Sequence, residues 1–166
     1  MALDTKLYLE LVANYTSALD LTTAAAPITF KRQGILASGA GAGAADLMWA
    51  DQRTISPSAT DTLDLAGTLT GMLGGTVTFA RIKGLFVAAA ASNVTNITVT
   101  RPATNGVPLM SAVSSGVPVK PGGIFTWYDP SAAGVVVTAG TGDLIDFVNS
   151  GATAATYDVV IIGALT

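Results

Sequence analysis

Two closely spaced pairs of aspartates are the strongest candidates for acid–base catalysis in this 166-residue chain. They are Asp61 with Asp64 in DTLD, and Asp143 with Asp146 in DLID. Two carboxylates can serve as acid and base in glycoside hydrolysis. Residues three apart on a strand point to opposite faces, however, so neither pair converges unless a turn bends the chain. We therefore expect these acids to bond turn amides or to face solvent.

Other reactive groups are scarce in the sequence. The chain contains no histidine and no cysteine, which removes Ser-His-Asp and Cys-His catalysis and nearly all zinc sites. A calcium ion takes about six to eight oxygen ligands, and no loop has the Asp-x-Asp-x-Asp spacing that would supply them. The glycine-rich run at 37–46 lacks the Gly-Lys-Ser/Thr ending of a phosphate-binding loop. We predict no catalytic residue, no cofactor and no metal site.

Three aromatic residues, Trp49, Trp127 and Tyr128, are candidates for a platform on which sugar rings stack. Large aromatic side chains are also the residues that dominate the packing of cores and interfaces. We favour packing in a core or an interface for all three, with a sugar-binding role as the alternative.

The composition indicates a protein that hides surface against a partner. Half of the residues are hydrophobic and 11% are charged, well below the roughly 25% of ordinary soluble domains. The eight lysines and arginines are scattered and the net charge is −3, so the clustered cations typical of nucleic-acid binding are missing. The longest apolar run, at 85–91, is far shorter than the ~20 residues of a membrane-spanning helix. We expect neither a nucleic-acid nor a membrane partner.

The first residues form a candidate interaction arm. Apolar side chains recur at a strict spacing of four, at Leu3, Leu7, Leu11, Tyr15 and Leu19. Tyr8 and Val12 widen this stripe, as on an amphipathic helix. A strand through Leu7, Leu9 and Leu11 is the competing interpretation. We favour the helix, and we expect its apolar stripe to lie at an interface.

A linker separates this arm from the rest of the chain. The segment at 24–36 is expected to be extended, because Pro27 disfavours helix at Ala26. The glycines and alanines at 37–46 predict a flexible or closely packed linker. We therefore divide the chain into an arm and linker over residues 1–44 and a β-sandwich domain over residues 45–166.

From Asp46 onward the sequence is typical of β structure. Eight or so short apolar runs are separated by Gly, Pro, Asn and Ser turn signals, which predicts an antiparallel sandwich or barrel. The segment VTNITVTRP alternates cleanly, with Ile97 and Val99 on one face. The run at 75–87 changes phase beside Gly84, which suggests a β-bulge. A jelly roll is the specific fold that we predict.

Two of these strands are apolar on both faces, at 144–148 and 157–162. A strand with one wet face should alternate apolar and polar residues. We therefore expect Leu144, Val148, Val160 and Ile162 to be covered by the arm, by a second copy of the chain or by another protein. The alternative is that the loop at 103–119 folds back over them. A closed oligomer is the common solution for such surfaces, so we expect a homodimer or homotrimer.

Several segments of the chain resemble a family of virion structural proteins from tailed bacteriophages. They are ADLMWADQRTI, DTLDLAGTLTGMLGGTVTFARIKGLFV, AGTGDLIDFVNSG and YDVVIIG, and the resemblance extends from about Ala45 to Gly163. Within that family, the chain is most similar to jelly-roll cement or decoration proteins. The resemblance rests on patterns of packing and turns rather than on site residues.

The resemblance implies a structural role without catalysis. It implies a protein that binds the outside of the phage head and stabilises it by bridging major capsid proteins. Synthesis in the host cytoplasm agrees with the absence of cysteine and of a recognisable secretory signal. A tail or baseplate component, including one that binds host-surface glycans, is the alternative, because such assemblies reuse similar sandwiches.

Overall fold

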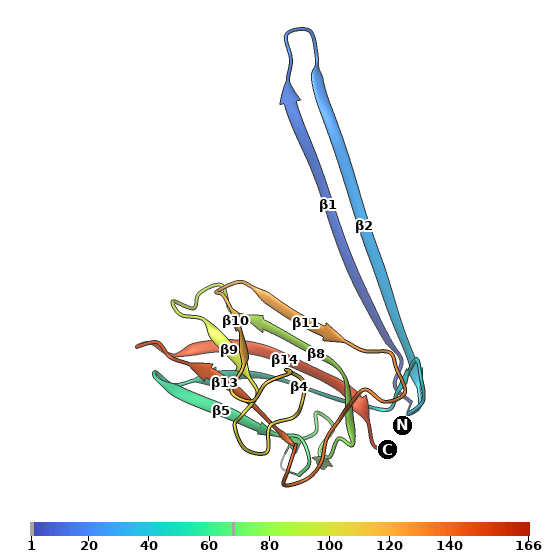
Figure 1. The fold of residues 1–166 in the computed structure, drawn as a ribbon, viewed down its shortest axis with the longest axis vertical. Coiled ribbons are helices and arrows are strands. Elements are labelled where there is room, and N and C mark those ends of the chain that lie inside the picture. Colours follow the sequence, from blue (N-terminus) through green and yellow to red (C-terminus); the bar gives the residue numbers. More distant parts are fainter. Residues whose placement is uncertain (1, 68) are drawn as a thin grey trace.

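The computed structural model describes residues 2–67 and 69–166. Every regular element in this part of the chain is a β-strand, so the prediction of a mainly β protein is confirmed. Within the same residues, no helix is long and apolar enough to cross a membrane. The elements form a body of facing sheets and a long hairpin that projects from it (Figure 1).

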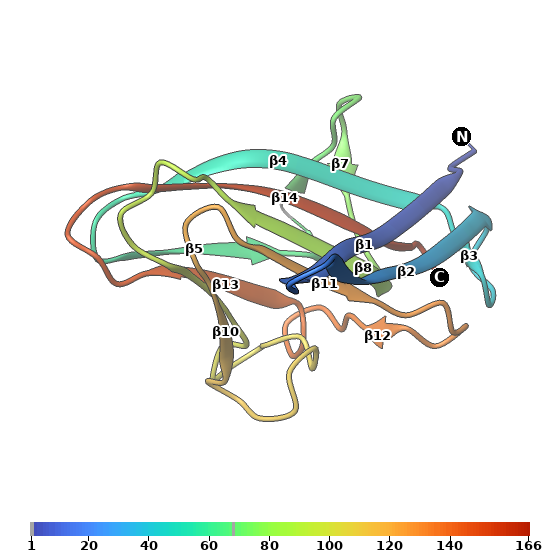
Figure 2. The same ribbon diagram turned by 90° about the horizontal axis from the view of Figure 1, so that it is seen from above.

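The body consists of two antiparallel sheets that pack face to face (Figures 1 and 2). The larger sheet has the order β11-β8-β14-β4, with β12 beside β8, and the smaller has the order β10-β9-β13-β5. The strands of the larger sheet are β4 (Leu47–Ile55), β8 (Arg81–Ala89), β11 (Ile124–Tyr128), β12 (Val135–Val136) and β14 (Ala155–Ala164). Those of the smaller sheet are β5 (Ala59–Asp64), β9 (Ile97–Thr100), β10 (Gly116–Val119) and β13 (Leu144–Asn149).

Three short strands complete the body. The pair β6 (Leu69–Thr70) and β7 (Thr76–Val77) forms a small antiparallel ribbon. The third, β3 (Ala44–Ala45), runs parallel to the last residues of the hairpin.

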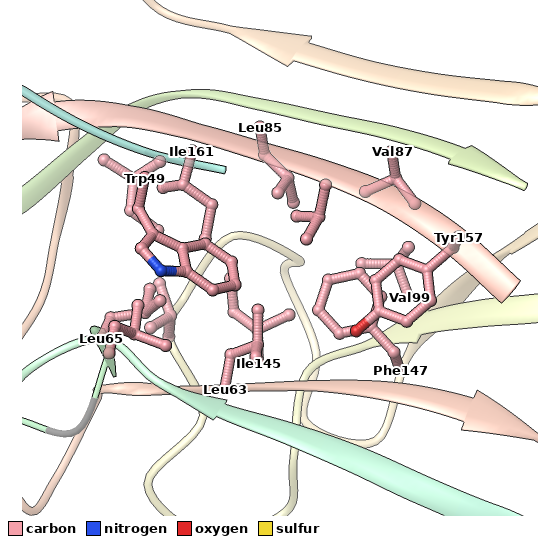
Figure 3. Packing of buried hydrophobic residues seen from close by; sticks show 14 of the residues in the cluster. Trp49, Leu63, Leu65, Leu85, Val87, Val99, Ile145, Phe147, Tyr157 and Ile161 are labelled. Atoms are coloured by element: carbon pink, nitrogen blue, oxygen red, sulfur yellow. The ribbon is translucent and has the colours of Figure 1, made fainter. Parts of the chain in front are cut away.

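The hydrophobic core lies between the two sheets (Figure 3). Alternate residues of β14 point into it, as the period of two requires: Tyr157, Val159 and Ile161 are all buried. From the facing sheet, Phe147 stacks on Tyr157 with ring centroids 4.5 Å apart. The indole nitrogen of the buried Trp49 donates a hydrogen bond of 3.0 Å to the carbonyl of Thr70. The buried polar tip of this tryptophan is therefore satisfied.

The predicted bulge beside Gly84 is confirmed. Ile162 pairs with Gly84 and Gly163 pairs with Ile82, so Lys83 is the extra residue on β8. The side chain of Lys83 is fully buried, and burial lowers the pKa of its ammonium group. A buried ammonium group requires oxygen partners, and the next segment of the chain supplies them.

Lys83 holds the glycine-alanine linker against the body. Its ammonium group donates to the carbonyls of Ala40 at 2.8 Å and Ala44 at 2.7 Å, and also to that of Gly41. The amide of Gly43 donates to the carbonyl of Pro130 at 2.7 Å. Of the two predicted forms of the linker, the structure has the closely packed one.

Replacing Lys83 with methionine is expected to lower the free energy of unfolding by about 2 kcal/mol, because three linker carbonyls lose their donor. Urea unfolding followed by circular dichroism measures the change. The exposed Lys120→Met serves as the control and should leave stability unchanged. Equal stability of the two variants would mean that Lys83 does not hold the linker.

The N-terminal arm is a β-hairpin, so the predicted helix is wrong. Strands β1 (Thr5–Ala18) and β2 (Thr23–Ser38) pair along their whole length, from Thr5 with Leu36 to Ala18 with Thr23. The amide of Leu19 donates to the carbonyl of Thr22 at 2.8 Å and closes the turn. A spacing of four is a multiple of two, so the leucine stripe falls on one face of a strand as well as on one face of a helix. Pairing with β2 decides between them.

Candidate interaction surface

The long hairpin has one apolar face, which we call the hairpin face. Because β1 and β2 pair in antiparallel register, odd-numbered residues of β1 share a face with even-numbered residues of β2. The hairpin face comprises Leu7, Leu9, Leu11, Ala13 and Tyr15 of β1 with Ala26, Ile28, Phe30, Arg32 and Gly34 of β2. Its one charged member, Arg32, lies over the ring of Phe30, with the guanidinium carbon 4.6 Å from the ring centroid. The face is thus apolar apart from a single cation.

The opposite face of the hairpin is mainly polar. Glu10 and Lys31 lie opposite each other and form an ion pair at 2.7 Å. The side-chain amide of Gln33 donates to the hydroxyl of Tyr8 at 3.2 Å. Val12 is the exposed aliphatic side chain in the middle of this face, paired with Thr29. The hairpin is therefore amphipathic, with solvent expected on this side.

The hairpin face is exposed along most of its length. The exposed fractions are 57% for Leu9, 55% for Leu11, 79% for Tyr15, 59% for Ile28 and 42% for Phe30. An isolated two-stranded hairpin is marginally stable in water and gains stability when a hydrophobic face is covered. The arm therefore carries an apolar surface that another molecule can cover.

At its base the same face packs on the body. Leu3 and the buried Leu36 join a second apolar cluster that contains Ile162 and the partly buried Val160 and Phe86. These three body residues lie on the outer side of the larger sheet, away from the core. The chain's own arm therefore covers part of the second face of β14, including Ile162, which is 4% exposed.

Gly34 allows the hairpin to approach β11 closely. A Cβ atom at this position would lie 2.7 Å from Cζ of Tyr128, which is too close for any real side chain. The Tyr128 ring therefore rests against the backbone of β2. This contact and the Leu36 cluster fix where the hairpin leaves the body.

The outer side of the larger sheet, which we call the outer face, carries both apolar and polar side chains beyond the base of the hairpin, the exposed polar ones including Gln52 and Thr126. Ile124 is 75% exposed and Met48 is 38% exposed on this side, and Val160 is half-buried. Asp158 is the acid on the same side and accepts a hydrogen bond of 2.8 Å from the side-chain amide of Gln52. The hairpin face and the outer face therefore meet at the Leu36 cluster.

The predicted contact residues on β13 lie elsewhere. Leu144 and Val148 are on the outer side of the smaller sheet, and both are half-buried. Their neighbours across β5 and β9 are polar: Thr60, Thr62, Asp64, Thr98 and Thr100. The amide of Val107 donates to the carbonyl of Leu144 at 2.9 Å, so the loop at 103–119 borders this strand. The structure does not bring Leu144 and Val148 together with the hairpin face.

Of the arm residues predicted for an interface, Leu3 and Leu7 are partly buried and Leu11, Tyr15 and Leu19 are exposed. The exposed Ile28 and Phe30 of β2 belong to the same surface but were not among the predicted contact residues. Alternation in PITFKRQGIL was the signal for them, and it has meaning only once β1 and β2 are paired.

The aspartate pairs do not converge, as their spacing predicts. Asp61 and Asp64 point to opposite sides of β5, and Asp64 accepts a hydrogen bond of 2.9 Å from the amide of Ala66. Asp143 accepts a bond from a turn amide, and Asp146 accepts one of 2.6 Å from the hydroxyl of Thr62. Within residues 2–67 and 69–166, no three acidic side chains gather at a point where they could hold a metal ion.

The three candidate aromatic residues do not form one platform. Trp49 is buried in the core, and Trp127 packs against the same core from β11. Tyr128, the next residue along, packs in the cluster at the base of the hairpin. Neighbouring residues of a strand point to opposite faces, so Trp127 and Tyr128 are separated by the sheet. Their positions agree with the packing role that we favoured.

Asp61 is the exception to the expectation that the acids bond turn amides or face solvent, because it is mostly buried in an ionic network on the body. Arg53 donates two hydrogen bonds to its carboxylate, and Tyr157 donates a third at 2.9 Å. The bonds from Arg53 contribute most to holding the pKa of Asp61 below its usual value, against the opposing effect of burial. Burial is also the largest cause of the raised pKa of the Tyr157 hydroxyl. This network joins β4, β5 and β14 at the edge of the core.

Acid is therefore expected to weaken the body through Asp61. Because its pKa is lower in the folded chain than in the unfolded chain, its contribution is complete above about pH 4 and is lost as the pH falls further. Asp61→Asn should flatten the loss of stability below about pH 4 in urea unfolding at a series of pH values. Asp158→Asn, which also removes one carboxylate but from an exposed position, serves as the control. Identical pH profiles for the two variants would contradict this role of Asp61.

The chain was compared with protein-family models, with curated proteins and with solved structures, and none of them matches it.

Proposed function

We propose that this chain is a structural protein of a tailed-bacteriophage virion, which binds the outside of the head and bridges neighbouring major capsid proteins. The observation that carries the proposal is the long hairpin with one exposed apolar face. Such a hairpin gains stability when another surface covers it. Exposed apolar patches larger than a few hundred Å² are typical of interaction sites. The resemblance of residues 45–163 to cement proteins supplies the class of partner.

The strand order supports a jelly roll as the finer description of the body. The eight main strands, in chain order, are β4, β5, β8, β9, β10, β11, β13 and β14. In one sheet the first strand lies beside the eighth, followed by the third and the sixth; in the other the second lies beside the seventh, followed by the fourth and the fifth. Jelly rolls are sandwiches of eight such strands in two sheets, and virus capsids use them widely.

Purified virions of the phage that encodes this chain provide the test. Quantitative mass spectrometry should find the protein at a copy number close to that of the major capsid protein. Cryo-electron microscopy should place it on the outer surface of the head. Heads assembled without the protein should break at a lower temperature, and adding the purified chain should restore their stability. Absence of the chain from virions would overturn the proposal.

The copy number also separates head attachment from the alternative role in the tail or baseplate. Tail and baseplate components are present in far fewer copies than capsid subunits. A low copy number, with density at the tail in electron microscopy, would instead assign the protein to the tail or baseplate. Binding of the purified chain to host polysaccharide, lost in Trp127→Ala while circular dichroism shows that the variant stays folded, would then support the glycan-binding form of that role.

A further inference from the structure

We propose that two copies of this chain associate through their hairpin faces, which stack against each other while each hairpin tip reaches the outer face of the other copy. This self-association does not depend on the proposed role in the virion. It concerns the isolated chain, in which the second copy covers the hairpin face; in the proposed function the capsid surface takes the place of that second copy.

The position of the hairpin requires a cover from outside the chain. The hairpin face packs on its own body only at the base, around Leu36. Beyond that point β1 and β2 rise away from the sheets (Figure 1). In the view from above, the hairpin stands over the region of β8 and β11 rather than lying across the sheet (Figure 2). No other segment of the described chain extends along it, so its apolar side chains stay exposed.

The area of the hairpin face fits a dimer. Five large side chains, Leu9, Leu11, Tyr15, Ile28 and Phe30, are between 42% and 79% exposed. Aromatic side chains bury about 150–250 Å² each when fully covered, and leucine and isoleucine bury less; at these exposed fractions the five side chains present roughly 600 Å² per copy. Two stacked faces would bury roughly 1,200 Å², which is the lower bound for specific protein interfaces. Contacts of the tips would add to this area.

The shape of the surface suits a second copy. The hairpin face and the outer face meet at an angle at the Leu36 cluster, so together they form an L. Two such surfaces related by a twofold axis can place each hairpin against the other, with each tip at the partner's sheet. An isologous contact of this kind uses the same patch on both copies. At the tip, Leu19 is 56% exposed and Leu21 is 99% exposed, which provides apolar side chains for the partner's outer face.

The charges on this surface agree with the arrangement. The hairpin face carries one charged side chain, Arg32, which pairs with Leu9 on the base side of Leu11. In a twofold stack with each tip at the partner's sheet, the two copies of Arg32 therefore lie on opposite sides of the axis and do not face each other. The ion pair of Glu10 with Lys31 lies on the other side of the hairpin, where it stays in solvent. Arg32 is therefore the one charged side chain in the stacked region, where its guanidinium group lies over the ring of Phe30.

Two neighbouring residues give a matched test. Leu11 and Val12 are adjacent in the middle of β1, are 55% and 69% exposed, and point to opposite faces of the hairpin. Leu11→Glu places a charge in the proposed contact, where stacking would strip water from it and from the neighbouring Arg32, and should raise the dimer dissociation constant on the order of a hundredfold. Val12→Glu places the same charge in solvent and should leave the dissociation constant unchanged.

Analytical ultracentrifugation of the isolated full-length chain, over a range of concentrations, measures its mass in solution and the dimer dissociation constant. The expected result is a dimer for the unmodified chain and for Val12→Glu, and a monomer for Leu11→Glu. Circular dichroism and urea unfolding check that both variants keep the folded body. A monomeric unmodified chain, or equal dissociation constants for the two variants, would overturn the proposal. Because no virion is present, this result is independent of whether the chain belongs to a phage head.

Discussion

Replacing Phe147 with alanine is expected to lower the free energy of unfolding by about 4 kcal/mol. Phe147 is fully buried on β13, and its ring stacks on that of Tyr157 across the core. Truncation removes this contact and leaves a cavity between the two sheets. The cavity can close only partly, because hydrogen bonds between neighbouring strands hold both sheets in place. Urea unfolding monitored by tryptophan fluorescence measures the change, since Trp49 lies in the same core.

The next residue provides the control for this substitution. Val148 follows Phe147 on β13 but points to the outer side of the smaller sheet, where it is half-buried. Val148→Ala should change the free energy of unfolding by less than about 1 kcal/mol. Similar losses in the two variants would mean that the outer side of this sheet is packed as tightly as the core, in conflict with its threonine-rich neighbours.

The strands of the body were predictable from the sequence because each residue pattern has a local cause. The alternation of VTNITVTRP placed Ile97 and Val99 on one face, and both are buried on β9. The change of phase beside Gly84 identified the bulge, because one extra residue reverses the faces of all those after it. The pairing partners of these strands are distant in sequence, so their order in the sheets was not predictable from the same patterns.

The structure of the arm was harder to predict because its periodicity is ambiguous. A repeat of four residues advances a helix by a little more than one turn and keeps a strand on the same face. Nothing in β1 alone separates these cases. The decision comes from β2, whose residues Ile28 and Phe30 complete the apolar face only in the observed register. A search for a complementary alternating segment after the turn would have found it.

The structure of the linker was also only partly predictable from its own sequence. Glycines and alanines at 37–46 are compatible with either a flexible or an ordered segment. What orders the segment is Lys83, which is distant in sequence and buried because the bulge turns it toward the linker carbonyls. The candidate contact surface was likewise only partly predictable: Leu11 and Tyr15 are exposed on it, whereas Ile162 is covered by the chain itself.

On the proposed role in the virion, shortening the hairpin is expected to abolish attachment to heads while leaving the body folded. The change replaces residues 9–32 with Asn-Gly, so that Tyr8 and Gln33, which pair in the native hairpin, flank a two-residue turn. Leu3, Leu36 and the Gly34 contact with Tyr128 are kept, and so is the clamp of Lys83 on the linker. The free energy of unfolding of the body should therefore change by less than about 1 kcal/mol.

The expected loss of attachment follows from the area that the shortened chain lacks. Covering roughly 600 Å² of apolar surface contributes about 15 kcal/mol at 25 cal/mol per Å², before the cost of association and ordering. Removing that surface should leave no saturable binding when purified chain is titrated onto undecorated heads and bound protein is counted by mass spectrometry. Val12→Glu keeps the full hairpin face and should bind as the unmodified chain does. Unchanged binding by the shortened chain would place the head contact on the body, whereas its unfolding would show that the hairpin belongs to the folding unit of the body; either result contradicts the prediction.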